Sequence, residues 1–301
     1  MINDLPSVDT YIHQVIREHV DKIEKPGMTE YQKVKAVFDH IIEIGYYADS
    51  PALDVWRWRT ASDRIPTREE MRGLSMLVFG IDTCEGYSSA FSMLCAEMGV
   101  ETRYITGLTY LAQGGLGYHS WSQVKIDGVW YNIDCDLEDA RSKSGTVGYR
   151  YFLRSDEFMA KSHFWGQRLI DMNILPNEME KEIAAEYLGE KCTKDYPRPA
   201  NKYIPVTKEP DIPAIQDELR AELEIFESKY GTVEYMYLHT EPPVFIIYFL
   251  DKRGVKGIDQ DMVTFAEIYQ PTHCIIRKAG TEEWDLSMIP EAKQYGFIVY
   301  T

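Results

Sequence analysis

The sequence predicts an α+β chain in which helices come first, an antiparallel hairpin follows, and a smaller α+β segment ends the chain. Three observations support this prediction. Residues 84–98 repeat apolar side chains at helical spacing. Asp127-Gly128 separates two alternating, strand-like runs, which is typical of a hairpin turn. The chain has 301 residues, which is more than one compact core usually holds, and five prolines between residues 192 and 213 mark a candidate boundary between two domains.

The N-terminal forty residues predict two amphipathic helices. Thr29 is a suitable N-cap for the second, whose apolar positions recur at a spacing of three to four: Tyr31, Val34, Val37 and Ile41. An aromatic-rich stretch containing Trp56 and Trp58 follows, and then a short helical pattern from Glu69 to Val78.

A third strong helix is predicted to begin at Cys84, with Thr83 as its N-cap and Gly99 at its end. Its apolar stripe consists of Cys84, Tyr87, Ala90, Phe91, Leu94, Cys95 and Met98. A strand from Thr102 to Leu111 comes next, followed by the glycine-rich residues 114–117, which we interpret as a loop beside the cleft. The hairpin then comprises residues 119–126 and 129–134.

The rest of the chain predicts a connector and a second domain. Helices are expected at 155–160 and 176–188, and the proline-rich connector is expected to be extended. We therefore predict a catalytic domain at 1–191, a linker at 192–213 and a C-terminal α+β domain at 214–301. Its predicted elements are helices at 215–230 and 259–269 and strands at 233–238, 244–250, 273–278 and 296–301.

Charge and cysteine content exclude several classes of protein. The chain has 32 Lys+Arg and 48 Asp+Glu, a net charge of −16, which argues against binding to nucleic acids or anionic membranes. The five cysteines include no Cys-x-x-Cys pair, so reduced thiols are expected rather than disulfides. Cys84, His119 and Cys135 match no zinc signature, and no metal is expected.

No apolar run is long enough to span a bilayer, and no signal peptide is visible at the N-terminus. The expected location is therefore the cytoplasm, and a trimmed secreted or cell-surface form is the alternative. The sequence leaves the oligomeric state open.

The hairpin register predicts a histidine–carboxylate pair. A two-residue turn at 127–128 makes Trp121 face Asp134, and side chains alternate between the two faces of the sheet. His119 then lies diagonal to Asp134 and directly opposite Asp136. Diagonal neighbours are roughly 7–8 Å apart at the backbone, a distance that an imidazole and a carboxylate can bridge.

The predicted position of Cys84 suits a nucleophile. A thiolate is favoured at a helix N-terminus, where unpaired N–H groups carry partial positive charge. Asp82 and Glu85 oppose this effect, and we expect pairing with His119 to outweigh them, since both carboxylates can point to solvent.

Three motifs occur in the order expected for one family. They are Cys84-Glu85-Gly86-Tyr87, then His119-Ser120-Trp121, then Trp130-Tyr131-Asn132-Ile133-Asp134. Together they resemble the transglutaminase-like superfamily, with its Cys-x-Gly-Tyr helix start, His-Ala-Trp strand and Asp-Pro-Thr strand end. The resemblance covers roughly residues 30–170 and implies a papain-like core in which N-terminal helices pack on an antiparallel sheet.

This resemblance implies a catalytic triad. Cys84 corresponds to the nucleophile, His119 to the general base and Asp134 to the carboxylate that orients it. The chain departs from the family pattern at Cys135-Asp136, which replaces Pro-Thr, so Asp136 remains a competing partner for His119.

The resemblance also implies thioester chemistry without a cofactor, on a peptide or protein amide. Hydrolysis by a cysteine peptidase or amidase is the favoured hypothesis, and the alternatives are a crosslinking transglutaminase and an inactive binding or scaffold module. Four residues are candidates for the oxyanion site or substrate cleft: Trp56, Trp58, Trp121 and Asp136.

Overall fold

The computed structural model describes residues 5–48, 56–61, 64, 66–111, 114–141, 145–166, 168–169, 189–204 and 210–230, and the strands at 233–238, 244–249, 273–277 and 296–300. Its contacts divide the chain into two compact units. The core unit comprises Ile12–Asp54 and Pro66–Pro210, and the second unit comprises Met1–Tyr11, Val55–Ile65 and Asp211–Thr301. The helices predicted at 176–188 and 259–269 lie outside the described residues.

Helices form one layer of the core unit. They are α1 (Val8–Ile23), α2 (Glu30–Ile44), α4 (Arg68–Phe79) and α5 (Cys84–Glu97). Thr29 and Thr67 start α2 and α4 with reciprocal capping boxes, which satisfy N–H groups of the first helical turn. The apolar stripe predicted for α5 is confirmed, since Tyr87, Phe91 and Leu94 are fully buried.

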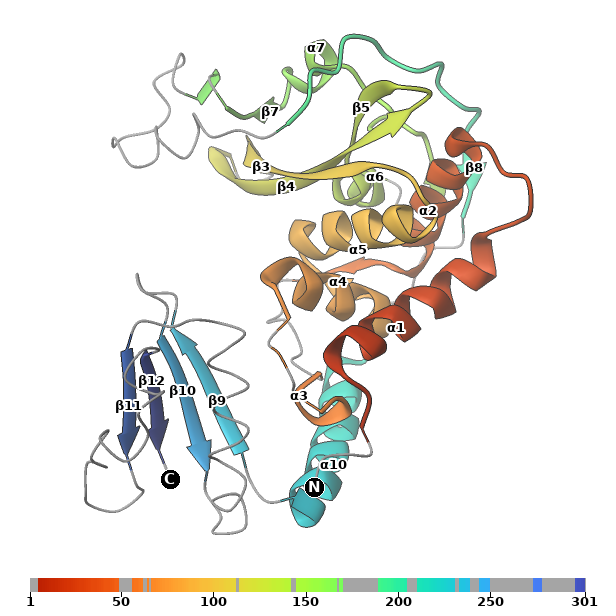
Figure 1. The fold of residues 1–301 in the computed structure, drawn as a ribbon. Helices are drawn as coiled ribbons and strands as arrows, with labels where there is room; N and C mark the ends of the chain where they lie inside the picture. The colour runs from red at the N-terminus through yellow and green to blue at the C-terminus, as the bar shows by residue number, and fades with distance from the viewer. Residues whose placement is uncertain are drawn as a thin grey trace. The chain divides into compact units, whose positions relative to one another are not determined.

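An antiparallel sheet forms the other layer, in the strand order β5-β4-β3-β7. Its strands are β3 (Thr102–Tyr110), β4 (Leu116–Ile126), β5 (Val129–Ile133) and β7 (His163–Phe164). Figure 1 shows α5 against this sheet and α4 on the side of α5 away from it. The predicted α+β class, with N-terminal helices packed on an antiparallel sheet, is confirmed.

The hairpin turn sets the register of β4 and β5. Asp127 and Gly128 have φ values of 48° and 77°, as a type I′ turn requires. Ile126 pairs with Val129 and Gln123 with Asn132, which confirms the predicted register. The strand β5 ends at Ile133, earlier than the predicted strand.

The segment predicted as an extended linker is part of the core unit up to Pro210. Cys192 is 1% exposed and its backbone N–H donates to Asp156 at 3.0 Å. Further along, β8 (Lys202–Tyr203) pairs with β6 (Thr146–Val147). The prolines therefore do not keep this segment away from the core, because its N–H groups find partners on neighbouring elements. By its contacts the core unit ends at Pro210.

The second unit contains α3 (Trp56–Arg59), α10 (Ile212–Tyr230) and a four-stranded mixed sheet. The strands are β9 (Val233–Leu238), β10 (Val244–Phe249), β11 (His273–Arg277) and β12 (Gly296–Tyr300), in the order β11-β12-β10-β9. Arg59 pairs with Glu222 at 2.6 Å and joins α3 to α10. Residues 56–61 therefore group by contacts with the C-terminal segment.

No helix in the described parts of the chain has the length and apolarity needed to cross a membrane.

Two buried histidines connect three helices of the core unit. His19 Nδ1 lies 2.8 Å from His40 Nε2, and His19 Nε2 lies 2.9 Å from the carbonyl oxygen of Leu77. Because a carbonyl only accepts, His19 donates through Nε2 and accepts from His40 through Nδ1. Burial, together with His19 and Lys22, lowers the pKa of His40 to about 4.

The lowered pKa predicts acid sensitivity. As the pH falls below about 6.5, the unfolded chain takes up a proton at His40 before the folded chain does, so stability decreases until about pH 4. The expected loss from this group is up to about 3 kcal/mol. The free energy of unfolding of the wild type should fall more steeply between pH 7 and 4.5 than that of His40→Gln, which keeps a donor without the titration. Parallel pH profiles would contradict the prediction.

Candidate active site

Cys84 is the first residue of α5 and is partly exposed. Thr83 occupies the N-cap position, as predicted, but its side chain makes no capping hydrogen bond. Its backbone N–H and its hydroxyl instead face Asp82 Oδ1, at 2.7 and 3.3 Å. The first turn of α5 thus begins without a side-chain cap, and the nucleophile candidate lies at the positive end of the helix dipole.

Gly86 makes room for a buried acid beneath this turn. A Cβ at Gly86 would lie 2.2 Å from Asp82 Cβ and 2.5 Å from Asp82 Cγ, which is far inside contact distance. Asp82 itself is fully buried. The glycine of the Cys-x-Gly-Tyr motif is therefore required by close packing against Asp82.

A Gly86→Ala substitution is expected to destabilise the protein. Alanine normally stabilises a helix relative to glycine by about 1 kcal/mol, but here overpacking should reverse the sign and cost about 1–3 kcal/mol. Denaturant unfolding measures the change. Gly73→Ala is the matched control, because its Cβ would meet the flexible Met93 side chain, which can move aside. Equal or greater stability of Gly86→Ala would contradict the packing argument.

The two carboxylates flanking Cys84 do not point freely to solvent, so that expectation was wrong. Arg72 lies 3.1 Å from Asp82 and 2.7 Å from Glu85, and Arg68 lies 2.9 Å from Glu85. Burial raises the pKa of Asp82 to about 6, although Arg72 opposes the shift. Burial acts against ionisation of Glu85, but the two arginines lower its pKa. Local arginines, rather than water, therefore offset the negative charge beside the thiol.

His119 and Asp134 meet as the hairpin register predicted. His119 Nε2 lies 2.7 Å from Asp134 Oδ2, and both side chains are almost completely buried. Asp134 follows directly after β5 and precedes α6 (Cys135–Arg141). Its Oδ1 accepts a 2.9 Å hydrogen bond from the backbone N–H of Leu137. The same carboxylate thus caps α6 and pairs with His119.

A second histidine shares this carboxylate. His163 on β7 is fully buried, and its Nε2 lies 2.9 Å from Asp134 Oδ2. Its Nδ1 lies 2.9 Å from the Ser162 hydroxyl. His163 is not among the candidate residues named from the sequence. Only the pairing of β7 with β3, where Thr109 faces His163, brings it to the site.

The charges of this cluster follow from its hydrogen bonds. Burial works against protonation of His119, but Asp134 raises the pKa of this imidazole well above its usual value, and a hydrogen bond to Cys84 adds to the effect. Burial also opposes ionisation of Asp134, yet His119 and His163 together lower the pKa of this carboxyl. Burial lowers the pKa of His163, so this ring is the neutral donor of the cluster. The arrangement favours an imidazolium at His119 facing an ionised Asp134.

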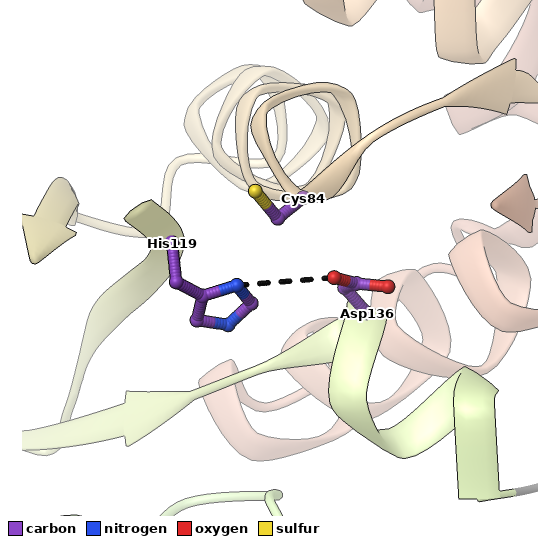
Figure 2. Close-up of side chains that lie close together, drawn as sticks. All are labelled: Cys84, His119 and Asp136. Carbon is purple, nitrogen blue, oxygen red and sulfur yellow. Dashed lines mark ion pairs between the residues drawn. The ribbon is translucent and has the colours of Figure 1, made fainter. Parts of the chain in front are cut away.

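Asp136 lies on the other edge of the His119 ring. The sequence placed it opposite His119 on the strand, but β5 has already ended and Asp136 belongs to the first turn of α6. Its Oδ2 is 3.9 Å from His119 Nδ1. Figure 2 shows Cys84, His119 and Asp136 converging from a helix, a strand and a second helix. One donor atom from each lies within 4.8 Å of the other two.

The predicted tryptophans occupy different environments. Trp121 is 1% exposed, stacks 6.2 Å behind the His119 ring and donates to Asn132, so it supports the histidine from the core and offers no surface to a substrate. Trp58 donates its indole N–H to Glu222. This is the same N–H that Trp58 would need in order to donate to an oxyanion. Trp56 is buried in the second unit.

The comparison with protein families agrees with this geometry. Residues 17–135 match the family model described as the transglutaminase-like superfamily. The match contains Cys84 at the start of α5, His119 on β4 and Asp134 after β5. Over these residues the chain is similar to the transglutaminase-like superfamily. The C-terminal segment lies outside the matched residues, and none of the curated proteins compared with the chain matches it.

Several solved structures are similar to part of this chain. A proposed cysteine protease from Cytophaga hutchinsonii is 19% identical over 44% of this chain and 40% of its own, with a TM-score of 0.30. A structure described as a TGase is 20% identical over 42% of this chain and 31% of its own, with a TM-score of 0.28. The arylamine N-acetyltransferase NAT3 of Bacillus cereus, described with a Cys-His-Glu triad, is 10% identical over 42% of this chain and 49% of its own, with a TM-score of 0.31. The chain therefore spans less than half the length of each.

Proposed function

We propose that this chain transfers an acyl group from a peptide or protein amide to Cys84, and that water then releases it. The observation that carries the proposal is the position of His119 between Cys84 on one side and the buried Asp134 carboxylate, 2.7 Å away, on the other. A nucleophile, a base and a group that orients the base are the parts that thiol catalysis needs.

In the first step, the Cys84 thiolate attacks the amide carbonyl carbon and forms the C–S bond. The C–N bond breaks as the His119 imidazolium gives its proton to the leaving amine. The Cys84 backbone N–H, at the uncapped start of α5, is the candidate donor to the developing oxyanion. Asp134 holds Nε2–H of His119 and so keeps Nδ1 directed at the reacting atoms.

In the second step, water attacks the thioester and gives its proton to His119. The C–O bond forms, the C–S bond breaks, and the thiolate–imidazolium pair is restored. Hydrolysis needs only these groups, whereas crosslinking also needs a surface that binds an amine-bearing partner. Water is therefore our preferred acceptor.

Intact-mass measurement after incubation with glutamine-containing peptide libraries tests this proposal. An acyl adduct should form on wild-type protein and be absent from Cys84→Ala. The matched control is Cys95→Ala on the same helix, where the thiol is completely buried. A parallel incubation with a primary amine identifies the acceptor: amide product identifies a transglutaminase, and free acid alone identifies a hydrolase. Absence of any adduct across the libraries would favour the scaffold alternative.

His163 is expected to act as a positioning residue in this reaction. Its Nε2–H is one of three donors to Asp134, so His163→Phe removes a hydrogen bond to a buried charge. We expect kcat to fall about tenfold to a hundredfold while KM changes little. His163→Gln places an amide donor at similar reach and should restore most of the rate. Equal loss in both variants would indicate a packing role only.

A further inference from the structure

We propose that Cys84, His119 and Asp136 form a binding site for Zn²⁺, with Sγ, Nδ1 and a carboxylate oxygen as the three ligands. This inference does not depend on the proposed reaction. It starts from the convergence shown in Figure 2, where one donor atom of each residue lies within 4.8 Å of the others. Thiolate, imidazole and carboxylate are the three side-chain ligand types that zinc takes in proteins.

The spacing suits a single ion. Zinc bonds of about 2.0–2.3 Å in a tetrahedral arrangement place neighbouring ligand atoms about 3.3–3.7 Å apart. His119 Nδ1 and Asp136 Oδ2 are 3.9 Å apart, so they need to approach by only about 0.5 Å to share an ion. Cys84 is partly exposed, which provides a path for the ion.

The surroundings of His119 already have the form of a metal-supporting shell. A zinc-bound histidine usually donates its other ring N–H to a carboxylate, which fixes the tautomer. His119 Nε2 lies 2.7 Å from Asp134 Oδ2, and Asp134 is held further by His163 and by the Leu137 backbone. This leaves Nδ1 as the ligand atom, on the edge of the ring that faces Asp136.

The charge of the site also matches a divalent cation. Once bound, the Cys84 thiolate and the Asp136 carboxylate would supply two negative charges to the ion, and Asp136 is only 6% exposed. A dication bound between them balances these two charges. Binding displaces the protons on Sγ and Nδ1 to the buffer. His119, Asp134 and His163 are also close together, but two hydrogen bonds already occupy their facing atoms.

Occupancy by zinc would block the nucleophile. The bond to the ion withdraws electron density from the thiolate and so lowers its nucleophilicity, and His119 cannot move a proton through a bonded Nδ1. Where the proposed acyl transfer operates, we therefore expect Zn²⁺ to inhibit it reversibly, with activity restored by a chelator.

Titration with Co²⁺ tests the site without any substrate, because a cobalt–thiolate bond gives an intense charge-transfer band in the near ultraviolet. Chelator-treated full-length wild type should show this band at one equivalent, and Zn²⁺ should displace it. The band should be lost in Cys84→Ala and in His119→Ala. It should persist in Cys95→Ala, which removes a thiol from the same helix.

Asp136→Asn should weaken Co²⁺ and Zn²⁺ binding by at least about tenfold, compared with Asp127→Asn. Asp127 is an exposed aspartate at the hairpin turn, so this control removes the same charge away from the site. The three-ligand site is overturned if wild type gives no band, if the band survives in Cys84→Ala, or if Asp136→Asn binds like wild type. Acyl adducts on Cys84 test the proposed function separately, so either idea can fail alone.

Discussion

Substitution of Cys84 with alanine is expected to abolish amide turnover. In the proposed reaction the thiolate forms the covalent bond on which both steps depend, so kcat/KM should fall by about four to six orders of magnitude. His119→Ala should fall nearly as far, because the same imidazole gives and takes the proton. Steady-state kinetics on a peptide identified by the adduct experiment measures both losses.

Cys95→Ala is the control for this comparison, since it makes the same substitution on α5 at a completely buried position. It should retain most of the wild-type rate. If Cys84→Ala kept more than a small fraction of activity, or if Cys95→Ala lost as much, the reaction would not proceed through the Cys84 sulfur.

Removing either of the two carboxylates beside His119 is expected to lower kcat, but by very different factors. Asp134→Ala should lower kcat by about 10³–10⁴, because Asp134 is the 2.7 Å partner that sets the imidazole tautomer and stabilises its charged form. Asp136→Ala should lower kcat far less, since its carboxylate is 3.9 Å away on the Nδ1 edge. The comparison is made on kcat for both variants.

Asp134→Asn refines this test. It keeps the shape of the side chain and an oxygen for the backbone of Leu137, but loses the charge. Its kcat should resemble that of Asp134→Ala, while denaturant unfolding should show less loss of stability. If Asp136→Ala lowered kcat more than Asp134→Ala, the carboxylate that orients His119 would be Asp136 and our assignment to Asp134 would be wrong.

Local patterns predicted the elements that carry the candidate triad. The apolar stripe from Cys84 to Met98 gave the start and direction of α5, and the Asp127-Gly128 turn set the register that brings His119 to Asp134. Both signals depend on short-range periodicity, which a single sequence contains. The approach of α5 to the hairpin came from the family resemblance, since periodicity does not report contacts between elements.

Features that depend on distant contacts were not predicted. His163 reaches Asp134 only because β7 pairs with β3, and Arg59 joins Glu222 across much of the chain. The predicted position of Asp136 on the strand was wrong, because Asp134 caps α6 and the helix begins at the next residue. Each of these positions depends on how the chain folds beyond its local pattern, which the spacing of residues in the sequence does not report.

The charge around Cys84 was misjudged for a similar reason. Glu85 and Asp82 looked unfavourable for a thiolate, and their partners Arg68 and Arg72 lie on α4, an element that sequence spacing does not orient. These arginines cannot be matched to individual acids without the packing of α4 on α5.

The rate of Cys84 alkylation by iodoacetamide near neutral pH tests the central claim most directly. An activated thiolate beside His119 should react faster than a free reference thiol, and faster than Cys192 and Cys274 in the folded protein. The rate should drop in His119→Ala to that of an ordinary exposed cysteine. If Cys84 reacts no faster than Cys192 or Cys274, or if removing His119 leaves its rate unchanged, then this sulfur is not a catalytic nucleophile.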